Sequence, residues 1–149
     1  MSELKQWMPW ATADYSAETP EIWCRKAAAS HINRTELAYA IFAKNGEHSG
    51  NLSALAINWK VPKCEIGYWL RTSHCGHGYM SEAVQTLVTM LAAAPISMKR
   101  IEIRCDVENI RSQKVAERCG FELEGTLRCQ VRSADETLRD MRIYSRVFP

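Results

Sequence analysis

The chain has 149 residues and a net charge of +2; 46% of the residues are hydrophobic and 24% are charged. This length suits one domain with a core of its own, and so small a net charge does not favour a nucleic-acid partner. The sequence has neither a run of about 18 apolar residues, which a membrane span needs, nor an apolar signal segment at its start. We therefore expect a single domain, residues 1–149, that works in the cytoplasm without a membrane or a direct nucleic-acid partner.

The six cysteines are widely spaced, and no two of them form a C-x-x-C pair. This spacing argues against a zinc site and against a redox dithiol, so we expect no bound metal. Because the chain is not a small, loop-rich domain, free and mostly buried thiols are favoured over disulfides.

The first predicted element is a helix over residues 20–31, which Thr19 can cap and Pro20 can begin. The sequence Asn-Gly-Glu at 45–47 is a hairpin signal, and alternating patterns rich in aromatic and branched residues surround it. These patterns predict an antiparallel meander of three strands, over residues 36–44, 51–60 and 63–71.

In the second half, apolar residues at helical spacing predict a helix over residues 81–94, which Pro95 ends. Asn109 can cap a second helix over residues 110–119. Alternation predicts the remaining strands, over residues 100–107, 121–127 and 140–148, the last two joined by a polar connection. A meander followed by β-α-β-α-β units predicts an α+β fold with a mixed, mostly antiparallel sheet and helices on both faces.

The stretch RTSHCGHGYMSEA, residues 71–83, joins the third predicted strand to the helix that follows it. Backbone N–H groups of a glycine turn can form an anion-binding nest, and the unpaired N–H groups of the next helix add to it. Gly76 and Gly78 are equally compatible with a plain tight turn. The stretch lacks the lysine of a Walker loop and the third glycine of a dinucleotide-binding fingerprint, so it matches neither motif.

The histidines and the cysteine of this stretch allow two other interpretations. Cys75 and His77 could form a nucleophile and a base, but the sequence offers no partner that would orient them or lower the thiol pKa. His74 and His77 could ligate a metal, but two further ligands are missing nearby. We therefore expect Cys75 and His77 to be exposed loop residues.

Three separated blocks stand out: EIGYWL at residues 65–70, GHGYMSEAV at residues 76–84 and NIRSQKVAERCGFELEG at residues 109–125. In their order and spacing they resemble the GNAT acetyltransferases, and specifically the ribosomal-protein N-terminal acetyltransferases of the RimJ/RimL type. The resemblance covers roughly residues 36–147. It implies a GNAT fold in which two central parallel strands, near residues 65–70 and 101–107, splay apart.

The resemblance also implies that acetyl-CoA is the co-substrate and lies in the gap between these strands. Its pantetheine arm would pair with Asn109 and with backbone groups of Trp69, Leu70 and Arg71. Its pyrophosphate would lie on the N–H groups of the loop, at Cys75, Gly76, His77, Gly78, Tyr79 and Met80.

The implied reaction is direct transfer of the acetyl group to a neutral primary amine. Ser112 would lie near the thioester sulfur and could protonate the leaving thiolate. Glu65 and Glu102 lie on the right strands for a general base, but Glu65 could instead cap the start of its strand and Glu102 could point to solvent. Because positioning alone can supply about 7–11 kcal/mol, a water chain or an amine that arrives neutral could take the place of a base.

The chain departs from the family pattern in three places. Cys75 stands where the family has Arg or Gln, and Met80 stands where the superfamily commonly has a small residue. The strand and helix with which family members usually begin have no counterpart here. Three residues near the start could line the acceptor site, join the core or contact a second copy in a homodimer: Trp7, Met8 and Trp10.

We therefore expect an acetyl-CoA-dependent N-acetyltransferase whose acceptor is a protein N-terminus. The resemblance implies that this is the N-terminus of a ribosomal protein. A polyamine or amino-sugar acetyltransferase is the alternative enzyme, although no cluster of carboxylates for a cationic acceptor can be assembled from the sequence. A non-catalytic CoA-binding module is the alternative outside enzymes. Alternation sends Tyr68 and Trp69 to opposite faces of their strand, so at least one of them is expected to be structural.

Overall fold

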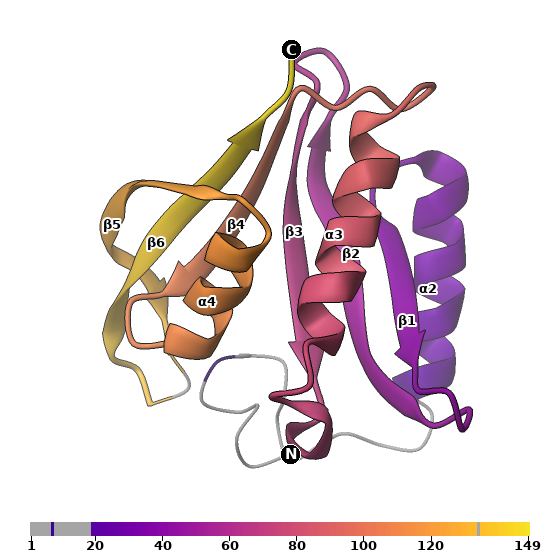
Figure 1. Cartoon of the computed structure of the whole chain (residues 1–149), viewed down its shortest axis with the longest axis horizontal. Helices are drawn as coiled ribbons and strands as arrows, with labels where there is room; N and C mark the ends of the chain where they lie inside the picture. Colours follow the sequence, from indigo (N-terminus) through magenta and orange to yellow (C-terminus); the bar gives the residue numbers. More distant parts are fainter. Residues whose placement is uncertain (1–6, 8–18, 134) are drawn as a thin grey trace.

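The computed structural model describes Trp7, residues 19–133 and residues 135–149 (Figure 1). Its helices are α2 (Thr19–Asn33), α3 (Tyr79–Ala92) and α4 (Ile110–Arg118), and a 3₁₀ turn, η1 (Thr72–His74), precedes α3. Its strands are β1 (Leu37–Phe42), β2 (His48–Asn58), β3 (Lys63–Leu70), β4 (Arg100–Asp106), β5 (Glu122–Arg132) and β6 (Leu138–Val147). The order of these elements is the predicted one.

The predicted boundaries fail mainly at the last hairpin. We predicted a strand that ends at residue 127 and a long polar connection, but β5 continues to Arg132 and pairs there with Leu138 of β6. Most of β5 is exposed on both faces, so its sequence lacks the alternation that a half-buried strand shows. Such a strand is defined by its backbone pairing alone, and that pairing cannot be recognised in the sequence.

The strands form a six-stranded sheet in the order β1-β2-β3-β4-β6-β5. All neighbours are antiparallel except β3 and β4, which are parallel. The predicted mixed, mostly antiparallel sheet is therefore confirmed.

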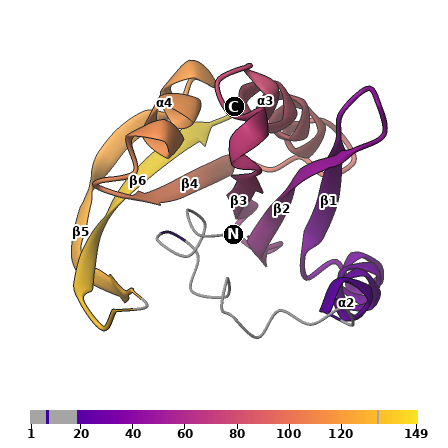
Figure 2. The same ribbon diagram turned by 90° about the horizontal axis from the view of Figure 1, so that it is seen from below.

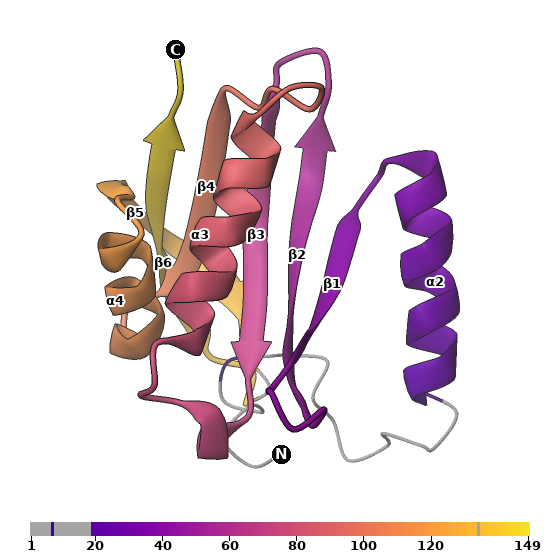
Figure 3. The same ribbon diagram turned by 45° about the vertical axis from the view of Figure 1, so that its right-hand side comes forward.

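Helices cover both faces of the sheet, as predicted. Helices α3 and α4 lie side by side on one face, and α2 lies on the opposite face beside β1 (Figures 2 and 3). The apolar side of α3 packs into a core that β3, β4 and β6 share, and its most deeply buried members include Val84, Val88, Leu91, Ile66, Ile101, Ile103 and Tyr144. Burying such side chains stabilises the fold by roughly 1.5–3 kcal/mol each.

The two parallel strands separate along their length. Pairing between β3 and β4 is confined to their first residues and ends at Glu65 and Glu102. Beyond that point β3 continues to pair with β2, and β4 continues to pair with β6. The strands consequently diverge toward their carboxyl ends, as Figure 1 shows, and the predicted splay is confirmed.

Two of the three apolar residues that could line the acceptor site, Met8 and Trp10, lie outside the described residues. So does the segment around them, except Trp7. In the part of the chain that the structure describes, none of the helices has the length and apolar character that crossing a membrane requires.

Candidate active site

A cleft of about 760 Å³ lies between the diverging ends of β3 and β4. Side chains alternate along both strands, so the cleft receives residues from both faces of the sheet. Among the predicted site residues, those that line it are Glu65, Trp69, Leu70, Cys75, Gly76, Gly78, Tyr79, Met80, Asn109 and Ser112. Arg71, His77 and Glu102 are not among the lining residues.

The glycine loop forms one end of the cleft. Gly76 and Gly78 have φ angles of +85° and +83°, and a side chain on either would meet no atom within 4 Å. Glycine is favoured at both positions because other residues rarely adopt a positive φ. The absence of side chains also leaves the space above the backbone open. No backbone carbonyl of the described residues accepts from the N–H groups of Gly76, His77 or Gly78. Together with the first turn of α3, these groups have the arrangement that an anion-binding nest requires.

His74 anchors this loop to the β1–β2 hairpin. Its Nδ1 is hydrogen-bonded to the buried Ser49 hydroxyl at 2.6 Å, and its Nε2 lies 3.7 Å from the Glu47 carboxylate. Glu47 also accepts a hydrogen bond from the guanidinium of Arg71 at 2.9 Å. These contacts fix the start of the loop, and they give His74 a structural partner that the sequence did not indicate.

Two residues predicted to contact the cofactor have other partners. The N–H of Arg71 donates to the carbonyl of Ser49 at 2.8 Å, and the carbonyl of Arg71 accepts from His74 at 2.9 Å. The ring of His77 stacks on Tyr79, with 5.5 Å between ring centroids. The thiol of Cys75 points to the carbonyl of Arg71 at 3.5 Å, so Cys75 and His77 each have a different neighbour.

Ser112 lies at the start of α4, opposite β3. Asn109 caps this helix as predicted: its side-chain oxygen accepts from the N–H of Ser112 at 3.1 Å. The hydroxyl of Tyr68 lies 2.9 Å from Ser112 Oγ and donates to the Ser112 carbonyl at 3.2 Å. Burial raises the pKa of Tyr68, and its hydrogen bond with Ser112 offsets part of that effect. The neutral phenol and the serine hydroxyl thus form one hydrogen-bonded pair at the cleft.

Cys105 lies beside this pair and also lines the cleft. Burial raises the pKa of its thiol to about 11, and a hydrogen bond with Ser112 partly offsets the shift. The thiol is therefore protonated at neutral pH and behaves as a small apolar side chain.

Glu65 lies on the other face of the sheet, where β3 and β4 separate. Its carboxylate is 3.3 Å from the guanidinium of Arg104, which also binds Glu102 at 2.9 Å. Burial raises the pKa of Glu65, and the charge of Arg104 offsets only part of the shift. A half-buried carboxylate with a raised pKa is a stronger base than an exposed one.

Glu102 has a different environment from Glu65. Its burial favours the neutral form, but hydrogen bonds from Arg100 and Arg104 outweigh this and lower the pKa of Glu102. Arg100 binds one of its oxygens at 2.8 Å and Arg104 the other at 2.9 Å. Because both oxygens are occupied and the side chain does not line the cleft, Glu102 can act on the site only through Arg104.

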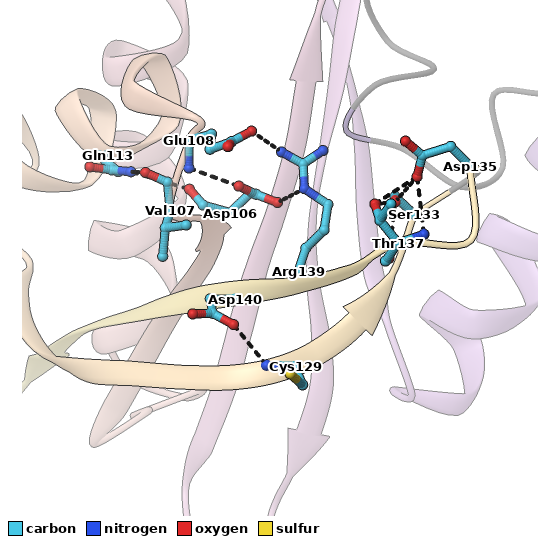
Figure 4. Close-up of polar contacts among 10 residues, drawn as sticks. All are labelled: Asp106, Val107, Glu108, Gln113, Cys129, Ser133, Asp135, Thr137, Arg139 and Asp140. Atoms are coloured by element: carbon cyan, nitrogen blue, oxygen red, sulfur yellow. Dashed lines mark hydrogen bonds and ion pairs between the residues drawn. The ribbon is translucent and has the colours of Figure 1, made fainter.

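The loop between β4 and α4 is fixed by a cluster of polar contacts (Figure 4). Arg139 of β6 binds Asp106 and Glu108, each at 2.6 Å, and Asp106 also accepts from the N–H of Glu108 at 2.7 Å. The side-chain amide of Gln113 donates to the carbonyls of Asp106 and Val107 at 3.2 and 2.8 Å. This cluster sets the position of Asn109 and therefore the start of α4.

The comparisons with known proteins agree with this geometry. Residues 1–122 match the sequence profile of the acetyltransferase (GNAT) domain. The ribosomal-protein-serine acetyltransferase of Escherichia coli (strain K12) is 34% identical over 127 residues, which are 83% of this chain and 70% of that protein. The chain therefore belongs to the GNAT acetyltransferase family, whose members are acetyl-CoA-dependent N-acetyltransferases.

Solved structures give the same result. RimL, a ribosomal L7/L12 α-N-protein acetyltransferase in complex with coenzyme A, superimposes with a TM-score of 0.91 at 31% identity, over 99% of this chain and 81% of that one. The microcin C7 self-immunity acetyltransferase MccE, in complex with acetyl-CoA and AMP, also gives 0.91, at 26% identity over 99% and 80%. The predicted family and fold are confirmed, and these relatives bind coenzyme A or acetyl-CoA.

Proposed function

We propose that the chain transfers the acetyl group of acetyl-CoA to the α-amine of a protein N-terminus, with a ribosomal protein as the first candidate. The observation that supports this proposal is the cleft, whose lining includes the glycine loop, Glu65 and Ser112. The similarity to an enzyme named for acetylating a ribosomal protein supports the acceptor class.

The residues present fit acetyl-CoA. The nest has N–H groups without backbone acceptors and no side chain above its glycines, which suits a pyrophosphate. We propose that residues 75–80 hold this group, and that Trp69, Leu70 and Asn109 hold the pantetheine arm. Arg71 and His77 are the weakest members of the predicted set, because other groups occupy the backbone of the first and the ring of the second.

Acetyl-CoA supplies an acetyl group activated as a thioester, and the chain must manage two protons. We propose that Glu65, on the face of the sheet away from α3 and α4, accepts the proton that the amine loses. Ser112, hydrogen-bonded to Tyr68 on the helix-covered face, would donate a proton to the sulfur of the leaving group. Glu102 would hold Arg104 against Glu65, which makes it a positioning residue.

The charge of the cleft favours an N-terminal amine over a polyamine. An α-amine has a pKa of about 7.7–8.0 and a lysine-like amine one of about 10.4, so a moderate base such as Glu65 suits the former. The carboxylates among the described lining residues, Glu65 and Asp106, are both paired with arginines. A polycation would require carboxylates that are not already neutralised.

MccE, whose structure was solved with acetyl-CoA and AMP, supports a second candidate, a small-molecule acceptor. Thiol release from acetyl-CoA should therefore be measured with peptides beginning in Ser, Ala or Met, their N-terminally blocked forms, polyamines and amino sugars. We expect turnover with free peptide N-termini and none with blocked ones. Preference for a polyamine or amino sugar would favour the second candidate, and acetyl-CoA binding without any turnover would favour a non-catalytic module.

A further inference from the structure

Helix α4 presents a row of basic side chains to the cleft. Arg111, Lys114 and Arg118 recur at helical spacing, so they lie on one side of the helix. All three are exposed, and all three line the cleft. None of the lining residues that α3 and α4 contribute is acidic. The acidic residue of α4, Glu117, is directed elsewhere, where it accepts a hydrogen bond from Tyr144 at 3.3 Å.

This basic row runs from the proposed acid to the nest. At the start of α4, Ser112 contacts Tyr68. At its end, the thiol of Cys119 donates to the carbonyl of Ser81, in the first turn of α3, at 3.4 Å. Arg118 lines the same cleft as Ser81. The two helices lie side by side in every view (Figures 1 to 3).

Coenzyme A carries more phosphate than the nest can bind. Besides its pyrophosphate it has a phosphomonoester on the ribose 3′ oxygen, and the glycine loop offers one set of N–H groups and no charged side chain, because Cys75 occupies the position before Gly76. Side chains suited to a second phosphate are a guanidinium, which binds two oxygens at once, and an ammonium, which acts as a point charge. Arg118 and Lys114 provide one of each.

We propose that Lys114 and Arg118 bind the 3′-phosphate of acetyl-CoA and thereby make the enzyme selective for coenzyme A over its 3′-dephospho form. The inference rests on the proposed cofactor site, and it adds residues of α4 that the glycine loop does not include. Because the pair is exposed, its contribution decreases as salt screens it.

The test is a comparison of two ligands by titration calorimetry: coenzyme A and 3′-dephospho-coenzyme A. For the wild-type chain at low salt we expect a Kd about tenfold lower for coenzyme A, since one exposed charge-assisted contact is worth up to about tenfold in affinity. The double variant Lys114→Gln, Arg118→Gln should bind both ligands with nearly equal Kd. Its Kd for the dephospho form should stay within about twofold of wild type.

A matched control removes the same charge elsewhere. Lys60 and Arg128 are exposed and do not line the cleft, so the variant Lys60→Gln, Arg128→Gln should keep the wild-type preference. Glutamine preserves helix propensity at both α4 positions, and melting temperatures verify that the variants are folded.

The possible failures are distinguishable. If the α4 double variant keeps the tenfold preference, or weakens both ligands equally, the 3′-phosphate assignment is wrong. If the wild-type chain binds neither ligand, the proposed cofactor site itself is wrong, and the inference is overturned with it.

Discussion

The contact between Tyr68 and Ser112 joins two residues that are 44 positions apart, and it gives the serine hydroxyl a partner outside its own helix. A serine hydroxyl alone is a weak acid. A second hydroxyl at 2.9 Å can pass a proton to Ser112 as the serine gives one to the sulfur, and Tyr68 would then regain its proton from solvent. Proton donation to the leaving thiolate would therefore depend on both side chains.

We expect Ser112→Ala to lower kcat by about 10²-fold, within the usual range for loss of an acid or base, and to change the Kd for acetyl-CoA by less than threefold. Tyr68→Phe should lower kcat in the same way, and the double variant should be little worse than either single one, because residues that act as a unit are not additive. Steady-state kinetics and calorimetry measure both quantities.

Tyr39→Phe is the matched control for this pair, since Tyr39 is partly buried and its hydroxyl contacts Met90 at 3.8 Å, away from the cleft. It should retain wild-type kcat. Full activity of Ser112→Ala would remove the serine from the reaction.

If Glu65 is the base, its ionisation should determine how activity depends on pH. As a base it must be ionised, and because its pKa is raised above the usual value of 4.5, activity should fall as pH decreases through a higher range than for an ordinary glutamate. The acceptor amine must also lose a proton, with a pKa of about 7.7–8.0. A plot of log kcat/KM against pH should therefore approach a slope of 2 at low pH for the wild type, and 1 for Glu65→Gln.

Glu65→Gln should also lower kcat by about 10² to 10⁴-fold. Glu102→Gln leaves the cleft carboxylate in place and should keep the steeper slope, although its weaker hold on Arg104 can lower the rate. A slope of 2 that persists in Glu65→Gln would show that another group is the base.

At the scale of secondary structure, β2 helps to set the position of the glycine loop, because its backbone approaches β3 closely at Gly50. A Cβ at this buried position would lie 2.2 Å from the carbonyl oxygen of Trp69 and 2.9 Å from the Cα of Leu70. Those residues precede the loop, and the N–H of Arg71 is bonded to the neighbouring Ser49. Gly50 therefore allows the end of β3 to lie where the cleft requires it.

We expect Gly50→Ala to lower the free energy of unfolding by about 1–3 kcal/mol, the usual cost of an overpacked site, and to weaken acetyl-CoA binding by displacing Trp69 and Leu70. Gly125→Ala is the control, because a Cβ there would meet nothing within 4 Å and the residue also lies in a strand. Its stability should change by less than about 0.5 kcal/mol. Denaturant unfolding compares the two, and equal stabilities would contradict the predicted clash.

Helix α3 and most strands could be predicted because their burial follows simple periods, whereas α2 and α4 were predicted from their start signals. The apolar row of α3, the cap at Asn109 and the alternation of β4 are all visible in the sequence, and the block around Ser112 located the start of α4. Strand β5 could not be bounded in this way, since it is exposed on both faces. The spacing of apolar residues indicates which side chains are buried. A strand that pairs through its backbone without burying side chains shows no such spacing.

The candidate site was also predictable only in part. The glycine loop and Ser112 could be found from local sequence, because a positive φ and a helix start are local properties. The partners of these residues come from other elements: Tyr68 for Ser112, Arg104 for Glu65, and Ser49 for His74. Glu65 and Glu102 looked equivalent in sequence. Burial raises the pKa of Glu65 and Arg104 offsets only part of the shift, whereas hydrogen bonds from two arginines outweigh burial and lower the pKa of Glu102.

At the scale of the whole molecule, the split sheet places the proposed base and the proposed acid on opposite faces. Alternation places Glu65 and Arg104 on the face away from α3 and α4, whereas Tyr68 faces Ser112 on the helix-covered face. The amine and the leaving thiolate would thus meet their proton partners from opposite sides of the sheet. Such an arrangement needs the strands to diverge, which the end of pairing after Glu65 and Glu102 produces.

Acetyl-CoA binding depends on the fold as a whole, because the proposed cofactor site combines the nest, β3 and α4. Acetyl-CoA at about 100 times its Kd should stabilise the native chain by about 2.7 kcal/mol, which corresponds to a rise in Tm of roughly 5–10 °C for a chain of this size. Gly78→Glu should abolish the rise, since it places a bulky negative group over the N–H groups of the nest.

A substitution at Gly78 also strains the backbone, because its φ is +83°. Gly46→Glu is therefore the control: Gly46 has a φ of +82°, equally open surroundings and a position in the β1–β2 hairpin outside the cleft. Both variants should melt below the wild type without ligand, and Gly46→Glu alone should recover the acetyl-CoA-dependent rise. If Gly78→Glu shows the full rise as well, the loop is only a turn and the pyrophosphate must bind elsewhere.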